Sequence, residues 1–295
     1  MAQGAGGGQE VQGSCLCGDV GWEYVGALQF MAACHCSMCR KSHGTAFATA
    51  VGGAADGFAW LRGEERTRQY RSSAELERRF CPRCGSPVPT PPQPGGLCVL
   101  NSGTLDDDPG IRLSAHIFAA SKAPWHEIDN DAARFDAYPP GMPAPSIDPV
   151  PLSAPEPGVV RGSCLCGGVA FEIRGELEPI LNCHCSRCRK AHAAAHASIL
   201  RVAPEQFCWV RGEALRERFD LPDAHSYQHC FCRTCGSSLP QHHPGLVGVH
   251  AGALDDDPGV RAGLHIWAGS KAPWFEIGDA LPSFDEYPPA EVTDP

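Results

Sequence analysis

Cysteines in two spacing patterns are the residues of this chain best suited to chemistry. The chain has 295 residues and 17 cysteines, and fourteen of them form two matching sets of seven. In each set a Cys-x-Cys pair and a distant Cys-x-x-Cys pair can close a tetrahedral site of four thiolates around zinc. The other three cysteines, spaced Cys-x-Cys-x-x-Cys, can hold zinc and leave its fourth position open to water or a substrate thiol. Zinc keeps a bound thiol in its thiolate form.

The spacing assigns every cysteine of these sets to a predicted zinc site, up to two per set and four per chain. The four-cysteine groups are Cys15, Cys17, Cys81 and Cys84, and Cys164, Cys166, Cys232 and Cys235. The three-cysteine groups, our candidate catalytic residues, are Cys34, Cys36 and Cys39, and Cys183, Cys185 and Cys188. Buried free cysteines or disulfides are the alternative for the four-cysteine groups, and two complete copies argue against it. Closure by a histidine or a fourth cysteine stays open for the three-cysteine groups.

Basic residues directly after the three-cysteine groups predict a pocket for a thiol substrate. These residues are Arg40, Lys41 and His43 in the first copy, and Arg189, Lys190 and His192 in the second. Their positive charge could favour a bound thiolate or a substrate carboxylate. For the two histidines, a solvated position in a loop is the simpler alternative.

The cysteine sets belong to a longer internal repeat. Residues 13–18, 105–110 and 121–125 return 149 positions later, whereas the Cys-x-x-Cys pairs lie 151 apart. The second copy therefore gains two residues before its Cys-x-x-Cys pair and loses two after it, as surface loops tolerate. We expect domains at 10–140 and 159–290, joined by a Pro/Ala-rich linker at 141–158. The repeat also suggests an intrachain pseudo-dimer with an approximate twofold axis.

Alternating apolar residues predict that both copies are built of strands. Val20, Trp22 and Tyr24 alternate in the first copy, and residues 169–173 repeat this pattern in the second. Helix is expected only as a short turn after Cys39 and Cys188. The predicted fold class is mainly β, with two tandem zinc-containing domains of small antiparallel sheets stapled by metal.

Composition and charge argue against several classes of partner. The net charge of −10 disfavours a nucleic-acid surface, which needs clustered Lys and Arg. No apolar run approaches the roughly 20 residues that span a bilayer, so no membrane partner is expected. The N-terminal residues lack the basic and apolar pattern of a secretory signal. We therefore expect a cytoplasmic protein, because a reducing compartment favours metal binding over disulfides.

Each half resembles the glutathione-dependent formaldehyde-activating enzyme family, which also includes centromere protein V. The resemblance rests on Gly-Ser-Cys-Leu-Cys-Gly, Cys-His-Cys-Ser-x-Cys-Arg-Lys, Phe-Cys-x-x-Cys-Gly, Leu-Asp-Asp-Asp-Pro and Ser-Lys-Ala-Pro-Trp, each present twice. It implies a β-tent-like fold, structural zinc on the four-cysteine groups and catalytic-type zinc on the three-cysteine groups. It also implies carbon–sulfur lyase chemistry that forms or cleaves S-(hydroxymethyl)glutathione, with glutathione as the small-molecule thiol partner. A tandem copy departs from the usual single-domain member.

Two classes of function stay open on these grounds. The first is a zinc-dependent carbon–sulfur lyase-type enzyme that acts on a thiol adduct. The second is a non-catalytic zinc-binding scaffold or interaction module, which the likeness to centromere protein V permits. In a third arrangement, one copy catalyses and the other supports packing. Both copies keep the three-cysteine group, which favours the enzyme.

Overall fold

Strands dominate the structure, a computed structural model that describes residues 9–142 and 156–289. Several small sheets and one short α-helix in each half confirm the predicted mainly β fold class. No helix within the described ranges is long and apolar enough to cross a membrane. The predicted linker at 141–158 lies mostly outside these ranges, and the domain boundaries at 10–140 and 159–290 stay predictions.

Three small sheets and one helix form the first half. One sheet has the order β1 (Gln9–Ser14), β2 (Gly21–Gly26) and β5 (Phe58–Arg62). The largest has the order β11 (Ala133–Arg134), β10 (Ala115–Ile117), β3 (Leu28–Cys34), β4 (Ala48–Ala54) and β9 (Leu97–Asn101). The third has the order β6 (Arg68–Arg71), β7 (Glu77–Phe80) and β8 (Pro87–Val88). The helix is α1 (Ser37–His43).

The second half repeats this plan. Its three-stranded sheet has the order β12 (Val159–Ser163), β13 (Ala170–Arg174) and β16 (Phe207–Arg211). Its five-stranded sheet has the order β19 (Gln241–His243), β20 (Leu246–His250), β15 (Ala197–Val202), β14 (Ile180–Cys183) and β21 (Ala262–Ile266). A hairpin joins β17 (Arg216–Asp220) and β18 (Gln228–Cys232), and the helix is α2 (Ser186–His192).

Short 3-10 turns connect many of these elements. They are η1 (Ala55–Gly57), η2 (Glu64–Arg66), η3 (Ser102–Thr104), η4 (Ala119–Ser121), η5 (Pro204–Gln206), η6 (Glu213–Leu215), η7 (Ala251–Ala253) and η8 (Ala268–Ser270). Two of them, η3 and η7, contact the helix of the opposite half.

The alternating apolar residues bury one face of the strands, as predicted. Trp22 and Tyr24 of β2 are buried while Glu23 between them is partly exposed, and Phe171 and Ile173 repeat this in β13. The five-stranded sheets are not purely antiparallel, because β10 runs parallel to β3 and β21 runs parallel to β14. This parallel pairing brings β10 and β21 alongside the strands that end in the first cysteine of each three-cysteine group.

The length differences between the copies fall in turns. The turn between β6 and β7 spans residues 72–76, and the corresponding turn between β17 and β18 spans residues 221–227. This turn holds the two residues that the second copy gains. The compensating loss lies between the Cys-x-x-Cys pair and the strands β9 and β20.

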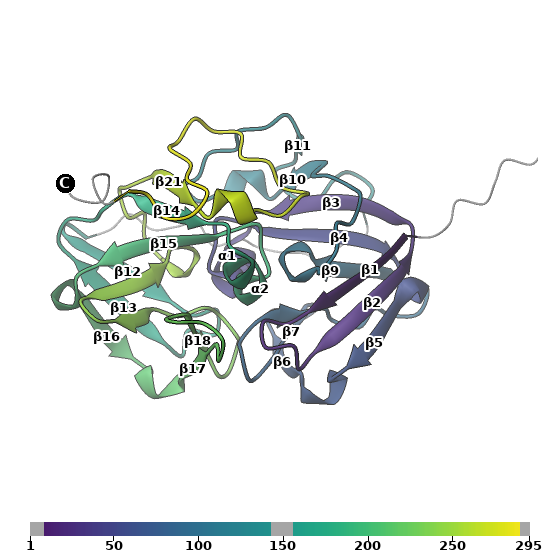
Figure 1. The fold of residues 1–295 in the computed structure, drawn as a ribbon, viewed down its shortest axis with the longest axis horizontal. Coiled ribbons are helices and arrows are strands. Elements are labelled where there is room, and N and C mark those ends of the chain that lie inside the picture. The colour runs from purple at the N-terminus through teal and green to yellow at the C-terminus, as the bar shows by residue number, and fades with distance from the viewer. Residues whose placement is uncertain (1–8, 143–155, 290–295) are drawn as a thin grey trace, which may run out of the picture.

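The two halves meet through reciprocal contacts around the helices. Figure 1 shows α1 and α2 next to each other between the halves. Helix α1 packs against η7 and α2 packs against η3. His43 Nδ1 lies 2.7 Å from the His192 oxygen, and His192 Nδ1 lies 2.6 Å from the His43 oxygen. Such paired contacts are what an intrachain pseudo-dimer requires.

Replacing Gly252 by alanine is expected to separate or destabilise the halves. A methyl group there would lie 2.3 Å from the Thr45 nitrogen and 2.4 Å from the Arg40 oxygen, and backbone atoms cannot move aside cheaply. We expect Gly252→Ala to lower the free energy of unfolding by about 1–3 kcal/mol, measured by denaturant titration. Gly248→Ala is the control, since its methyl would meet the nearest atom at 3.6 Å. Equal stability of both variants would contradict this packing.

Candidate metal centres

Tight turns at the ends of strands bring the four-cysteine groups together. Cys15 follows β1, and Cys81 follows β7. Gly18 and Gly85, which follow the second cysteine of each pair, have φ of 78° and 77°, a region that favours glycine. The four sulfurs of each group lie within 4.8 Å of one another and could hold a metal ion, as the spacing predicts.

The sulfur distances match the dimensions of a tetrahedral zinc site. Cys15 and Cys17 lie 3.5 Å apart, and Cys17 and Cys81 lie 3.7 Å apart. In the second half the corresponding distances are 3.4 and 3.8 Å. A tetrahedron with Zn–S bonds of about 2.3 Å has sulfur–sulfur edges of about 3.8 Å. The hydrogen bond with Cys17 raises the pKa of the Cys15 thiol, whereas a bound cation would stabilise the thiolate.

The start of each helix shapes the three-cysteine groups. Cys34 ends β3, and Cys36 caps α1 by accepting a hydrogen bond from the Cys39 nitrogen at 3.4 Å. Cys185 caps α2 in the same way through the Cys188 nitrogen at 3.4 Å. The sulfurs of each group lie within 4.8 Å of one another. Among the described residues, no fourth cysteine, histidine or carboxylate joins either group within that distance.

A pair of buried histidines lies behind each three-cysteine group. His35 Nε2 lies 2.8 Å from His116 Nδ1, and His116 Nε2 lies 3.0 Å from the Asn130 amide oxygen. Because that oxygen also accepts a hydrogen bond from the Ala132 nitrogen, it is the acceptor and His116 Nε2 is the donor. His35 Nε2 must then donate to His116, which leaves His35 Nδ1 as a buried lone pair with no hydrogen-bond partner within residues 9–142 and 156–289.

The second half has the same histidine pair, but its second histidine contacts a carboxylate in place of an amide. His184 Nε2 lies 2.8 Å from His265 Nδ1, and His265 Nε2 lies 3.0 Å from the Asp279 carboxylate. Burial lowers the pKa of His35 to about 3 and that of His184 to about 2. Both histidines are therefore neutral near neutral pH and are weak bases.

Two polar side chains that the sequence analysis missed contact the third cysteine of each group. Arg78 on β7 directs its Nη2 to the Cys39 sulfur at 3.6 Å. In the second half, Tyr227 packs against the cluster that contains Cys183 and Cys188, and burial together with the charge of the cysteine group raises its pKa. In the first half, burial and the charge of Cys34 raise the pKa of Tyr138. No motif signals these residues, since neither Arg78 nor Tyr227 recurs at the matching position of the other copy.

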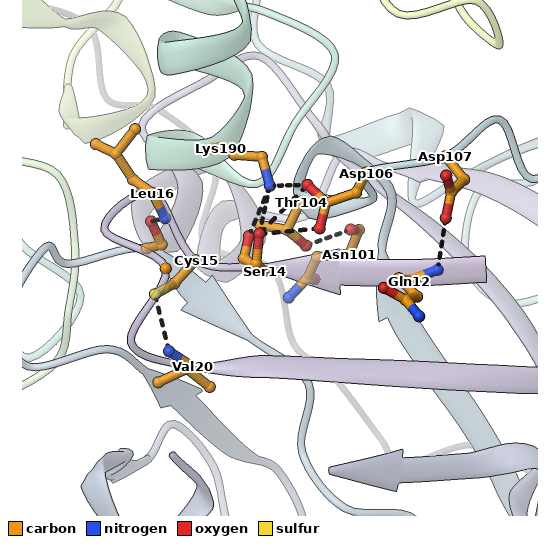
Figure 2. Close-up of polar contacts among 12 residues, drawn as sticks. Gln12, Ser14, Cys15, Leu16, Val20, Asn101, Thr104, Asp106, Asp107 and Lys190 are labelled. Atoms are coloured by element: carbon orange, nitrogen blue, oxygen red, sulfur yellow. Dashed lines mark hydrogen bonds and ion pairs between the residues drawn. The ribbon is translucent and has the colours of Figure 1, made fainter. Parts of the chain in front are cut away.

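The two lysines predicted to line a substrate pocket instead reach across to the other half. Figure 2 shows Lys190 of α2 pointing at Ser14 and Asp106. Its Nζ lies 2.7 Å from the Ser14 hydroxyl and forms an ion pair with Asp106. Lys41 likewise lies 2.8 Å from the Ser163 hydroxyl. Each lysine thus connects the helix of one three-cysteine group to the residue before a four-cysteine group.

The other predicted pocket residues are turned toward backbone atoms. Arg40 Nε lies 3.4 Å from the His35 oxygen, and Arg189 Nε lies 3.4 Å from the His184 oxygen. His43 and His192 contact each other's backbone oxygen, as described above. A role for these residues in binding a thiol stays a prediction.

Aromatic side chains join the two histidine pairs at the centre of the molecule. Phe47 packs 5.1 Å from His126 and 5.6 Å from His196, and His196 packs 5.6 Å from Phe275, measured between ring centroids. In the alignment of the two copies, Phe47 corresponds to His196 and His126 corresponds to Phe275. The copies have therefore exchanged one phenylalanine and one histidine within the same cluster. Burial lowers the pKa of His196 to about 4 and lowers that of His126 as well.

Fold and site together define a tandem cysteine-rich β protein in which each half carries two groups that could hold metal ions. The family model for the glutathione-dependent formaldehyde-activating enzyme matches residues 10–121 and again residues 159–270. The chain therefore belongs to this family, with two tandem copies.

The chain is also similar to solved structures. A crystal structure of a Rhodobacter sphaeroides protein is 28% identical and covers 32% of this chain and 87% of its own, with a TM-score of 0.28. No curated protein matches the chain.

Metal removal is expected to affect the two kinds of group differently. A strong chelator should abolish the β circular dichroism signal, because metal binding and folding are coupled in closed thiolate sites. We expect Cys81→Ser to do the same, whereas Cys39→Ser should keep the fold and lower the metal content from four ions per chain to three, measured by elemental analysis. Native circular dichroism after complete metal removal would contradict the structural role.

The lowered pKa of the buried central histidines should make the folded protein less stable in acid. His196 has a folded-state pKa of about 4, below the unfolded value of about 6.5. The contribution of neutral His196 to the free energy of unfolding is fully present above about pH 6.5 and is lost as the pH falls toward about 4. In metal-saturated protein, His196→Phe should reduce the loss of unfolding free energy between about pH 7.5 and 5.5 by about 1 kcal/mol. The exposed His225→Phe is the control, and an equal effect of both variants would refute this origin.

Proposed function

We propose that this chain is a zinc-dependent carbon–sulfur lyase-type enzyme that acts on a thiol adduct. The proposed reaction is the reversible formation of S-(hydroxymethyl)glutathione from formaldehyde and glutathione. The observation that carries this proposal is the three-cysteine group, which has no fourth protein ligand among the described residues. Membership of the glutathione-dependent formaldehyde-activating enzyme family supports the choice of thiol and aldehyde.

Zinc is the metal that these donors fit best, because thiolate sets at tetrahedral spacing are typical of zinc. In this proposal the four-cysteine groups hold structural zinc. The groups Cys34, Cys36 and Cys39, and Cys183, Cys185 and Cys188, hold the catalytic ion. When bound there, zinc would lower the pKa of a substrate thiol and keep it as a nucleophilic thiolate. A reducing, cytoplasmic location suits a chain whose cysteines are all free.

Residues next to the three-cysteine groups position the sulfurs, and the adjacent histidine is too weak a base to take part. Arg78 holds the Cys39 sulfur by a hydrogen bond, and Tyr227 packs against the cluster that contains Cys188. In the forward reaction a sulfur–carbon bond forms, the carbonyl π bond breaks, and the thiol proton ends on the new hydroxyl oxygen. His35 cannot take up that proton near neutral pH, because burial holds its pKa at about 3.

The reaction must be measured against a spontaneous background. We expect zinc-loaded protein to accelerate exchange between glutathione and S-(hydroxymethyl)glutathione, followed by exchange-transfer NMR at equilibrium. The double variant Cys39→Ser, Cys188→Ser should return the exchange rate to the uncatalysed value while keeping the native circular dichroism signal. Absence of acceleration by fully loaded wild-type protein would refute the enzyme and leave the zinc-binding scaffold as the function.

A further inference from the structure

The two three-cysteine groups have the same ligands but different neighbours on the adjacent strand. Arg78 on β7 lies two residues before Phe80, and His229 occupies the matching position of β18, two residues before Phe231. His229 turns away to the other half, where its Nδ1 lies 2.7 Å from the Cys84 oxygen. In that half, Tyr227, which immediately precedes β18, packs against the cluster that contains Cys183 and Cys188.

Each of these neighbours is held in place by its own turn. The Arg78 Nε donates to the Ser72 hydroxyl at 3.2 Å, at the start of the turn between β6 and β7. Tyr227 ends the longer turn between β17 and β18, where its carbonyl accepts a hydrogen bond from the Leu221 nitrogen at 3.1 Å. The two residues gained by the second copy thus lie in the turn that presents a phenol in place of a guanidinium.

The exchange changes the charge around the metal position. Three thiolates and one divalent ion carry one net negative charge. The guanidinium of Arg78 neutralises it, because arginine stays protonated at any pH of interest. The phenol of Tyr227 carries no charge. Arg40 and Arg189 interact electrostatically with the cysteines of their own group in both halves, so Arg78 is the additional positive charge of the first group. A fourth ligand that is itself an anion is therefore favoured more strongly at the first group than at the second.

A second, independent difference between the halves also makes the surroundings of the second group more negative. The histidine pair of the first half ends on the neutral amide of Asn130, and that of the second half ends on the carboxylate of Asp279. Asp279 lies beyond two imidazole rings from the cysteine loop, so its effect is weaker than that of the direct contact. It adds negative charge to the half that already lacks the arginine.

We propose that the two groups have divided their roles, so that the first, with Arg78, takes an anionic thiolate as the fourth ligand of its metal. The second group, with Tyr227, keeps a neutral ligand such as water or imidazole. This division rests on the proposed binding of metal and thiol at the three-cysteine groups. Arg78 is a positioning and specificity residue in this scheme, since it contacts a metal ligand rather than the substrate.

Cobalt substitution tests the division without measuring turnover. The full chain is loaded with Co²⁺, and difference absorption spectra follow titration with glutathione and, separately, with imidazole. We expect glutathione to add sulfur-to-cobalt charge-transfer intensity equivalent to one cobalt per chain. This signal should disappear in Cys39→Ser and persist in Cys188→Ser, which are matched variants of the two copies. Its persistence in Cys39→Ser would overturn the proposal.

Variants of the two neighbours then isolate the effect of charge. Arg78→Met should weaken glutathione binding about 10- to 100-fold, as expected for loss of one hydrogen bond to a charged group, and should leave imidazole binding unchanged. Arg78→Lys should recover most of the affinity, and Tyr227→Phe should leave it within about twofold. Equal losses in Arg78→Met and Tyr227→Phe, or equal losses for glutathione and imidazole, would refute a charge-based division.

The outcomes separate this inference from the proposed function. If thiolate binds only the first group but no exchange is accelerated, the division holds and the enzyme activity is refuted. If exchange is accelerated and both groups bind thiolate with equal affinity, the activity holds and the division is refuted.

Discussion

The reciprocal packing of α1 against η7 and of α2 against η3 is the contact on which both kinds of cysteine group depend. Each helix has only seven residues, too few to be stable alone in water. The start of each helix carries part of a three-cysteine group. The lysine of each helix reaches the strand before the four-cysteine group of the opposite half. The histidine at its end contacts the opposite helix. Neither half completes this arrangement alone, which makes the duplicated chain the unit that orders its sites.

The two copies have diverged in ways that complement each other. The central cluster keeps two phenylalanines and two histidines, but Phe47 and His196 occupy matching positions, as do His126 and Phe275. The charge around the three-cysteine groups also differs between the copies. The first half has Arg78 and Asn130 near its group, whereas the second half has Tyr227 and Asp279. In a single chain with two copies, matching positions can change independently, since each residue occurs only once.

Cysteine spacing predicted each pair and each three-cysteine group, because residues two or three positions apart in a turn must lie close together. The repetition of the whole pattern suggested that the two distant pairs of each copy share one metal, and the fold brings Cys17 to 3.7 Å from Cys81. It also predicted the strands, since apolar alternation reports which face is buried. The length differences were correctly expected in loops. The β3–β10 parallel pairing was not anticipated, because a short strand far along the chain carries no sign of which neighbour it will join.

The surroundings of the sulfurs were decided by tertiary structure alone. Lys41 and Lys190 follow the three-cysteine groups directly, yet the helix directs them to the opposite half. Arg78 and Tyr227 lie about 40 positions from the cysteines they contact and occur in one copy each. The repeated motif therefore indicated which atoms could bind metal, because the geometry within each pair or triplet of cysteines is set by neighbours in sequence. The charge and hydrogen bonds that tune those atoms come from segments remote in the chain, and only folding brings them together.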